Sequence, residues 1–181
     1  MKVLVACEFS GIVRDAFISK GHDAMSCDLI PTIRPGPHYT GDARDLLGKG
    51  WDMMICHPPC THLASSGCQW FKYNRLLGMQ QAAYQFVRDL ITAPICKICL
   101  ENPIGVISTM WRKPNQIIQP YEYGHPFKKS TCLWLIGLPK LVPTNIVTPT
   151  HGSYAKDWVR DQKKRSLTFQ GIADAMADQW S

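Results

Sequence analysis

The side chains best suited to chemistry in this chain stand directly after short apolar runs. They are Glu8-Phe9-Ser10-Gly11, Asp28, Asp42, Pro58-Pro59-Cys60 and Glu101-Asn102-Pro103. In open α/β sheets a ligand binds outside the carboxyl ends of the strands. If the apolar runs are strands, we expect these side chains to meet at one edge of a sheet.

Cys60 follows two prolines after the apolar run 51–56. Because proline fixes its own φ and restricts the residue before it, Pro58-Pro59 predicts a stiff turn that presents the thiol in a fixed place. A thiol held there is a candidate nucleophile if positive charge or a helix N-terminus lowers its pKa. The alternative is an inert buried cysteine, since free cysteine is among the most buried residue types.

Glu101 stands at the end of another apolar run, residues 94–100. A carboxyl group in such a place either pairs with a cation or has a raised pKa suited to proton transfer. If the strands before Cys60 and Glu101 are neighbours in the sheet, the two side chains share one pocket.

A third group of residues indicates a nucleoside-containing ligand. Gly11 would allow the backbone of the first strand-to-helix turn to approach a ligand closely. Asp28, at the end of the second apolar run, is placed to accept hydrogen bonds from ribose hydroxyls. An ordinary loop acid remains the alternative for Asp28 and for Asp42. The sequence has no G-x-G-x-x-G and no P-loop motif, which counts against dinucleotide and triphosphate binding.

The elements that must position these residues alternate along the chain. The apolar pattern predicts strands over residues 2–7, 23–28, 51–56, 94–100 and 131–136, and helices over 12–19, 75–92 and 171–180. A short helix follows Asp45, and residues 30–39, which hold three prolines, are expected to be a loop. The simplest architecture is α/β, with one mostly parallel sheet and helices on both of its faces.

Length and composition set the class of the protein. At 181 residues we expect one domain over 1–181, in which residues 138–170 form a small basic insert. With 45% hydrophobic and 19% charged residues the composition is globular, and the net charge of +6 permits a phosphate-bearing partner without requiring one. The opening run is too short for a signal peptide or membrane span, so we expect a cytoplasmic protein without membrane association and with reduced thiols.

Taken together, these residues resemble the cytosine-C5 DNA methyltransferase family, most closely its short phage-type members. The segment CEFSGIVRDAF resembles the methyl-donor loop, HPPC the Pro-Cys motif, ENP the Glu-Asn motif, and FQGIADAMADQW the closing helix. The resemblance implies a Rossmann-like methyltransferase fold, S-adenosylmethionine as cofactor, DNA as partner, and the host cytoplasm if the gene is phage-borne. It assigns catalysis to Cys60 and Glu101, substrate contact to Asn102, and donor binding to Phe9, Ser10, Gly11, Asp28, Asp42 and Pro58.

The chemistry of cytosine explains why this family needs both catalytic residues. C5 is not nucleophilic enough to accept a methyl group until a thiolate adds at C6, the role implied for Cys60. Glu101 would bind the N3 and amino edge of the base and stabilise the proton gained there. Amino-group methyltransferases instead have a motif that resembles Asp/Asn/Ser-Pro-Pro-aromatic. This chain has His57 and Cys60 at the first and last positions of that motif, so it lacks both groups that methylation of an amine would need.

The chain departs from the family where DNA would be recognised. Only residues 138–170 separate Gly137 from Gly171, too few for an independent recognition domain. Low specificity, a homodimer that reads DNA, and a single-stranded or free-nucleotide substrate all remain open. Several cations are candidate nucleic-acid contacts or simply a solvated face: Lys128 and Lys129 in place of the family's paired arginines, and Lys156, Arg160, Lys163, Lys164 and Arg165.

Two other interpretations of the sequence are a metal or redox site and a protein without catalytic activity. Cysteine and histidine cluster over residues 56–68, and Cys96 and Cys99 form a C-x-x-C, which raises zinc or redox chemistry. Structural zinc usually takes paired knuckles on turns, whereas residues three apart on a strand point to opposite faces, so we expect no metal. The non-enzyme alternative is a nucleic-acid-binding module that has lost catalysis.

Overall fold

The computed structural model describes residues 1–150 and 161–181, and of Gln162 and Lys163 only the helical backbone. Its centre is a seven-stranded sheet in the order β3-β2-β1-β4-β5-β7-β6. The strands are β1 (Lys2–Ala6), β2 (Asp23–Asp28), β3 (His38–Thr40), β4 (Met53–Cys56), β5 (Lys97–Pro103), β6 (Gln116–Ile118) and β7 (Thr131–Ile136). The strands from β3 to β5 pair in parallel, and β7 lies antiparallel between β5 and β6. The predicted α/β fold with a mostly parallel sheet is confirmed.

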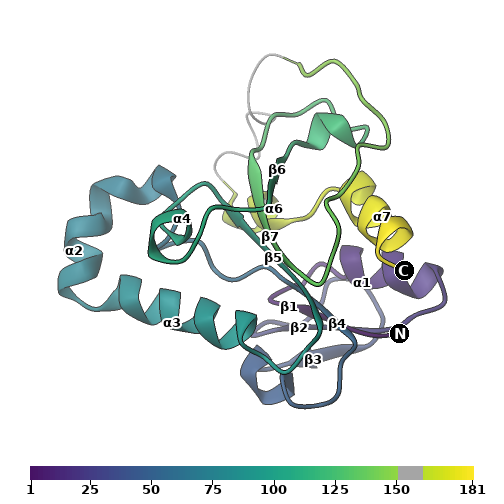
Figure 1. Cartoon of the computed structure of the whole chain (residues 1–181), viewed down its shortest axis with the longest axis horizontal. Helices are drawn as coiled ribbons and strands as arrows, with labels where there is room; N and C mark the ends of the chain where they lie inside the picture. The colour runs from purple at the N-terminus through teal and green to yellow at the C-terminus, as the bar shows by residue number, and fades with distance from the viewer. Residues whose placement is uncertain (151–160) are drawn as a thin grey trace.

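Helices cover both faces of this sheet (Figure 1). On one face Val3 and Val5 of β1 pack in a core with Phe17, and on the other Leu4 packs in a core with Leu90. Because β1 is buried on both sides, its sequence is continuously apolar instead of alternating. The helices are α1 (Ile12–Ser19), α2 (Phe71–Leu76), α3 (Met79–Ile91), α4 (Ile107–Met110), α6 (Gln162–Ser166) and α7 (Gln170–Gln179), with 3-10 turns η1 (Ala43–Leu46), η2 (Ser65–Trp70) and η3 (Pro120–Glu122).

The single helix predicted over residues 75–92 is wrong at its start. The structure has two helices there, α2 and α3, and Gly78 between them adopts φ 69°. This left-handed conformation ends a helix and is available to glycine without steric cost. The periodic apolar pattern belongs to α3 alone.

The strand predicted over residues 94–100 is shifted by three residues toward its carboxyl end, because β5 begins at Lys97 and ends at Pro103. Glu101, Asn102 and Pro103 continue β5 by pairing with β7, while the parallel neighbour β4 ends opposite Leu100. Glu101 therefore lies inside a strand but beyond the end of β4. Two short edge strands, β3 and β6, were not predicted, because three residues are too few to show a period.

Within the described residues, no helix is both long enough and apolar enough to cross a membrane. All eight cysteines are free thiols.

Candidate active site

The two strands that precede the candidate catalytic residues are neighbours, which is the condition under which Cys60 and Glu101 were expected to share a pocket. β4 pairs with β5, and the segments that follow them are joined by hydrogen bonds. Asn102 Nδ2 donates to the carbonyl of Pro58 at 2.9 Å, and the backbone N–H of Val106 donates to the carbonyl of Leu63 at 2.9 Å. The backbones that carry Cys60 and Glu101 are thereby held together.

Gly105 allows these two segments to approach closely. A Cβ atom at this position would lie 2.0 Å from the carbonyl oxygen of Leu63, much closer than any real contact. The need for glycine here comes from the packing of two loops, and nothing in the sequence pattern indicated it.

Cys60 lies in a turn that fixes its backbone. Its carbonyl accepts hydrogen bonds from the N–H groups of Leu63 at 2.9 Å and Ala64 at 2.8 Å, and its side chain is half-buried. Cys56 and Cys99 are fully buried, and burial raises the pKa of both thiols well above the ordinary value. Thiols that stay protonated are poor nucleophiles, so Cys60 is better placed to react than either of them.

Glu101 pairs with His57, a residue that sequence reasoning did not assign to the site. Nδ1 of His57 lies 3.2 Å from Oε2 of Glu101, and the two side chains are only 12% and 11% exposed. Burial opposes the charged form of each group, but the mutual attraction prevails: the pKa of His57 lies above its ordinary value and that of Glu101 below it. The position of His57, next to Pro58 and just after an apolar strand, was the available signal.

Unpaired polar atoms concentrate at this place. Across residues 1–150 and 161–181, four buried side-chain nitrogen and oxygen atoms make no hydrogen bond: Nε2 of His57, Nδ1 of His62, Oδ1 of Asn102, and Oε2 of Glu101, whose contact is the ion pair with Nδ1 of His57 at 3.2 Å. Buried polar groups in folded proteins are nearly always hydrogen-bonded. All four lie in the segments that follow β4 or end β5, so this edge of the sheet offers donors and acceptors that a polar ligand can complete.

Lys129 adds a cation to the same edge. It precedes β7, and burial lowers the pKa of its ammonium group against the opposing attraction of Glu101 and of Cys60. Its Nζ donates to the carbonyl of Arg165 at 2.8 Å and lies 5.9 Å from the centre of the Phe169 ring. Lys129 thus brings positive charge within electrostatic range of both catalytic candidates, while Lys128 is exposed.

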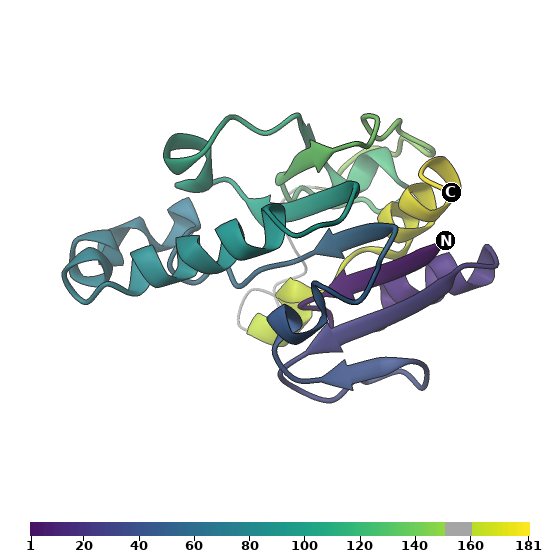
Figure 2. The ribbon, with the colours of Figure 1, turned by 60° about the horizontal axis from the view of Figure 1, so that its bottom comes forward.

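The basic segment reaches the site through α6. The bond from Lys129 to Arg165 ties this helix to the strand ends, and Figure 2 shows α6 beside the arrow tips of the parallel strands. Lys164 and Arg165 are both exposed there. The side chain of Lys163 and the whole of Lys156 and Arg160 lie outside the described residues.

At the end of β1, the predicted donor turn is built around Glu8. Its Oε1 accepts from the N–H of Val13 and from the hydroxyl of Ser10, both at 2.8 Å, and the side chain is buried. A carboxylate at a helix N-terminus satisfies free N–H groups and complements the helix dipole. Glu8 was expected at this edge of the sheet from its position after an apolar run, without a role of its own. The Ser10 hydroxyl donates to Glu8 and accepts from the N–H of Ile12 within the turn, and Phe9 is half-buried.

Two features favour glycine at position 11: its backbone conformation and the closeness of the Arg14 side chain. Its φ is 72°, and an added Cβ would lie 2.4 Å from a guanidinium nitrogen of Arg14. That fully buried guanidinium donates to the carbonyls of Arg34 at 3.2 Å and Pro35 at 3.1 Å, so it holds the proline-rich loop against the turn.

The two acids assigned to the donor differ in how far they are already engaged. Asp28 is half-buried at the end of β2 and accepts one backbone hydrogen bond, from Ile30 at 3.3 Å. Asp42 caps η1 and forms an ion pair with Arg44 at 2.6 Å, which lowers the pKa of Asp42. Beside Asp28, Leu29 is 74% exposed, an apolar surface at the carboxyl end of β2.

The described part of the chain holds no group of three or more His, Cys, Asp or Glu side chains that could bind a metal ion. Cys96 is exposed just before β5 and Cys99 is buried within it.

No protein-family model matches the sequence, and a comparison with curated proteins gave no match. Among solved structures, one similar chain is an E. coli protein described provisionally as a DNA modification methyltransferase encoded within a prophage. The two share 14% sequence identity at a TM-score of 0.48, over 82% of this chain and 52% of that one. This chain therefore spans about half the length of that protein.

Proposed function

We propose that this protein transfers a methyl group from S-adenosylmethionine to C5 of cytosine in DNA, through a covalent bond between Cys60 and C6. The observation that carries the proposal is the convergence, at the ends of β4 and β5, of the candidate nucleophile, the His57–Glu101 pair and Lys129. The buried atoms of His57, His62 and Asn102 that lack a hydrogen-bond partner at the same edge support a polar ligand there.

The residues around the end of β1 fit the methyl donor. Strand order changes direction between β1 and β4, and ligands of doubly wound sheets bind in the crevice at such a point. Asp28, whose carboxylate accepts only one hydrogen bond, would hold the ribose, and the Phe9 to Gly11 turn would flank the donor. Ser10, Asp42 and Pro58 complete the proposed donor side, on the family resemblance alone. When bound, S-adenosylmethionine supplies an electrophilic methyl group.

Attack on cytosine requires a thiolate and a proton for N3. The sulfur of Cys60 adds to C6 as the thiolate, and Lys129 is a cation within electrostatic range of it. Because His57 holds the pKa of Glu101 low, the pair carries its transferable proton on His57, and Glu101 passes that proton to N3 as the C6 bond forms. Oδ1 of Asn102 would accept a hydrogen bond from the exocyclic amino group. After C5 is methylated, a base takes the C5 proton, the electrons of that C–H bond restore the C5–C6 double bond, and the C6–sulfur bond breaks to release the thiolate. The proton gained at N3 returns to the Glu101–His57 pair.

DNA is the proposed substrate because cations surround this edge. Lys128, Lys129, Lys164 and Arg165 lie at or near it, and Lys156, Arg160 and Lys163 are proposed to extend the phosphate contacts. The alternatives that a short chain leaves open are a single strand and a free nucleotide.

Mass spectrometry of nucleosides tests the proposal. Purified protein and S-adenosylmethionine are incubated with DNA and, separately, with deoxycytidine nucleotides. We expect 5-methylcytosine in DNA, its loss in Cys60→Ser, and unchanged activity in Cys96→Ser, which alters an exposed thiol at the opposite end of β5. Full activity of Cys60→Ser would refute the nucleophile. Product from nucleotides alone would replace DNA as the substrate.

Calorimetric titration with S-adenosylmethionine separates an enzyme from a silent binding module. Cys60→Ser should bind the donor with wild-type affinity, because its thiol is not in the donor contact set. A wild-type protein that binds DNA but no donor would establish the module instead.

A further inference from the structure

The segment that follows Cys60 forms an arm, here called the α2 arm (residues 65–77, comprising η2, α2 and Leu77). It lies at the end of the molecule away from α1, α7 and both termini (Figures 1 and 2). Its large apolar side chains face solvent: Trp70 is 59% exposed, Tyr73 57% and Leu76 78%. Nothing in the packing of the fold requires aromatic residues at these positions.

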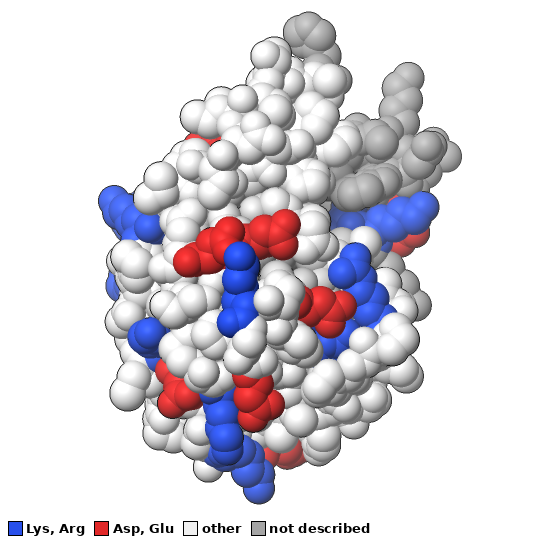
Figure 3. Space-filling model, turned by 90° about the vertical axis from the view of Figure 1, so that its right-hand side faces the viewer, with Lys and Arg blue, Asp and Glu red and all other residues white. Residues whose placement is uncertain are grey.

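The charge of the arm is of one sign. The sequence has no Asp or Glu between Asp52 and Asp89, and the arm carries Lys72 and Arg75. Neither cation takes part in any ion pair of the described residues. The end of the molecule that carries α1 and α7 differs, because cationic and anionic side chains are interspersed there (Figure 3). The arm is therefore a local cationic surface, suited to an anionic partner.

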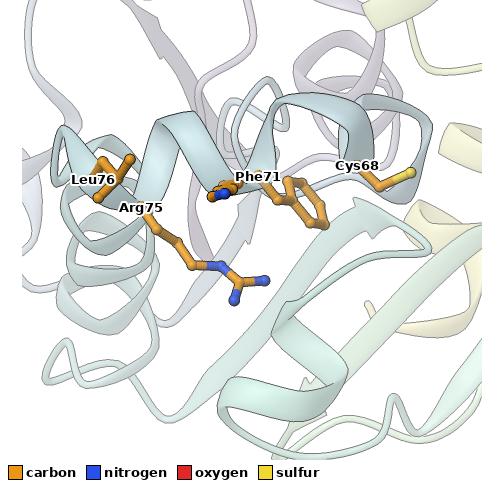
Figure 4. A pocket seen from close by; sticks show the side chains of 5 residues that line it. Cys68, Phe71, Arg75 and Leu76 are labelled. Atoms are coloured by element: carbon orange, nitrogen blue, oxygen red, sulfur yellow. The ribbon is translucent and has the colours of Figure 1, made fainter.

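Two hollows lie against the arm. The first, of about 520 Å³, is lined by Lys72 and by Cys68, Phe71 and Arg75, which lie along one side of the arm (Figure 4). The second, of about 410 Å³, is also lined by Arg75, together with Val106 and Thr109. These last residues follow β5, the strand that carries Glu101.

The arm is fixed to both catalytic segments. Ala64, which precedes η2, is hydrogen-bonded to the carbonyl of Cys60 at 2.8 Å and forms a β-bridge with Gly105. Ser65 donates through its backbone N–H to the carbonyl of Ile104 at 2.9 Å. A ligand on the arm is thus held at a set position relative to Cys60.

We propose that the α2 arm binds a single-stranded nucleic acid, with Trp70 and Tyr73 stacked on unpaired bases and Lys72 and Arg75 on phosphates. This inference rests on the proposed function, since it identifies the form of polynucleotide brought to Cys60. Aromatic side chains interleaved with cations are the usual means of holding single strands. In a duplex the base faces are covered by their neighbours, so exposed aromatic rings favour unpaired bases.

A second copy of this chain is the competing occupant of the exposed apolar side chains. A two-fold interface would place the same patch of both copies face to face. Lys72 and Arg75 of one copy would then meet those of the other with no acidic residue in the arm to pair them. Like charges brought together in this way oppose self-association, whereas a polyanion removes the conflict.

Fluorescence anisotropy with labelled oligonucleotides tests the proposal. The full-length chain carries Cys60→Ser and no methyl donor is present, so binding is measured without catalysis. The ligands are a deoxyribo-oligonucleotide of about 15 nucleotides, the ribo-oligonucleotide of the same sequence and the matching duplex, a length that spans a typical single-strand site. We expect a single strand to bind more tightly than the duplex, and the tighter of the two strands identifies the polymer.

Two double variants separate stacking from phosphate contact. Trp70→Ala with Tyr73→Ala should weaken single-strand binding about tenfold for each ring, with little change in its salt dependence. Lys72→Ala with Arg75→Ala should reduce the slope of log K against log salt by about 1.4, since each phosphate contact on a single strand contributes about 0.7.

A matched control removes the same charge elsewhere. Lys49 and Lys140 are exposed and lie before β4 and after β7, at the edge of the sheet opposite Cys60. Their double alanine variant should keep the wild-type slope. Trp70→Phe keeps a stacking ring and should retain most of the affinity for the single strand. That result would show that the loss of affinity in the alanine variant does not come from misfolding.

Three results would overturn the proposal: binding of the duplex as tightly as the single strand, alanine variants of the aromatic pair with wild-type affinity, or a dimeric mass in light scattering that these variants convert to a monomer. Failure of the proposed function is distinguishable. In that case oligonucleotide binding follows the pattern above, while the wild-type protein forms no 5-methylcytosine.

Discussion

Replacing His57 by Asn tests the electrostatic core of the active site. Asparagine is similar in size near the backbone and can still donate a hydrogen bond, but it cannot carry charge. In the wild-type protein, Nδ1 of His57 and Oε2 of Glu101 lie 3.2 Å apart at about one-tenth exposure. At an effective dielectric constant of about 20, two unit charges at this distance attract by about 5 kcal/mol before desolvation is counted. Removing one member of a buried pair typically costs roughly 3–5 kcal/mol, and Lys129 still compensates part of the Glu101 charge, so we expect about 3 kcal/mol.

The loss should depend on pH in a defined direction. The pKa of His57 lies above its ordinary value of 6.5, so its contribution to stability is complete below about pH 6.5 and is lost as pH rises through the folded-state pKa. The pKa of Glu101 lies below its ordinary value of 4.5, so its contribution is complete above that pH and is lost as pH falls through the folded-state pKa. The difference between wild type and His57→Asn should therefore be largest between pH 4.5 and 6.5, and it should shrink in mildly alkaline solution where His57 is neutral.

Urea denaturation of both proteins across this range measures the difference in unfolding free energy. The control is Arg44→Gln, which breaks the ion pair with Asp42; that pair is shorter, at 2.6 Å, but its side chains are 54% and 33% exposed. Because water screens exposed pairs, the control should cost less than about 1 kcal/mol. A loss in His57→Asn that is below about 1 kcal/mol, or equal at all pH values, would refute the assignment of a charged buried pair.

Three further changes probe the supports of the site. Gly105→Ala should destabilise the protein by about 1–3 kcal/mol and lower methyl transfer, because its Cβ would meet the carbonyl of Leu63; thermal melting and turnover measure both, and wild-type values would show that the loops are not tightly packed. Arg14→Met should cost about 3 kcal/mol in urea and increase proteolysis in the proline-rich loop, since the buried guanidinium binds that loop; unchanged cleavage would contradict this role. Glu8→Gln keeps the shape of the side chain but removes its charge from the N-terminus of α1. It should lower the free energy of unfolding in urea by about 1 kcal/mol, and an unchanged free energy would show that the charge does not stabilise the helix.

Patterns that depend on neighbouring residues in sequence were predicted well. The apolar run at the N-terminus and the amphipathic run over α1 each have one dominant period, and the structure places both elements within a residue of the prediction. The break between α2 and α3 was missed, because a glycine inside an apolar pattern is compatible with a continuous helix as well as with a helix end. The extension of β5 through Glu101 depends on pairing with β7, which is distant in the chain.

The site was predicted in part for the same reason. Residues at the ends of apolar runs, such as Cys60 and Glu101, can be recognised from their position. The adjacency of their strands was only a condition in the sequence analysis, and the structure establishes it. Whether Glu101 is held by His57, or a glycine is required by a carbonyl across a loop, depends on contacts between segments. Lys129 was assigned to the nucleic acid, and the structure places it near Glu101 and Cys60 as well.

Under the proposed function, the unpaired polar atoms would help the site to hold a base that has left its stack. Extruding a base costs a few kcal/mol and the cost is lowest when the base is already unpaired. Nε2 of His57 and Oδ1 of Asn102 have no hydrogen-bond partner in the described protein, although both are buried. Each hydrogen bond that a base makes to such an atom is worth about 1–3 kcal/mol, because the alternative is a buried group left unpaired. Two or three such bonds are comparable to the cost of extrusion. An apolar pocket of the same size could not supply them. Under the proposed function, the polar atoms that weaken the free protein would therefore favour the bound base, and a single strand held on the α2 arm would lower the remaining cost.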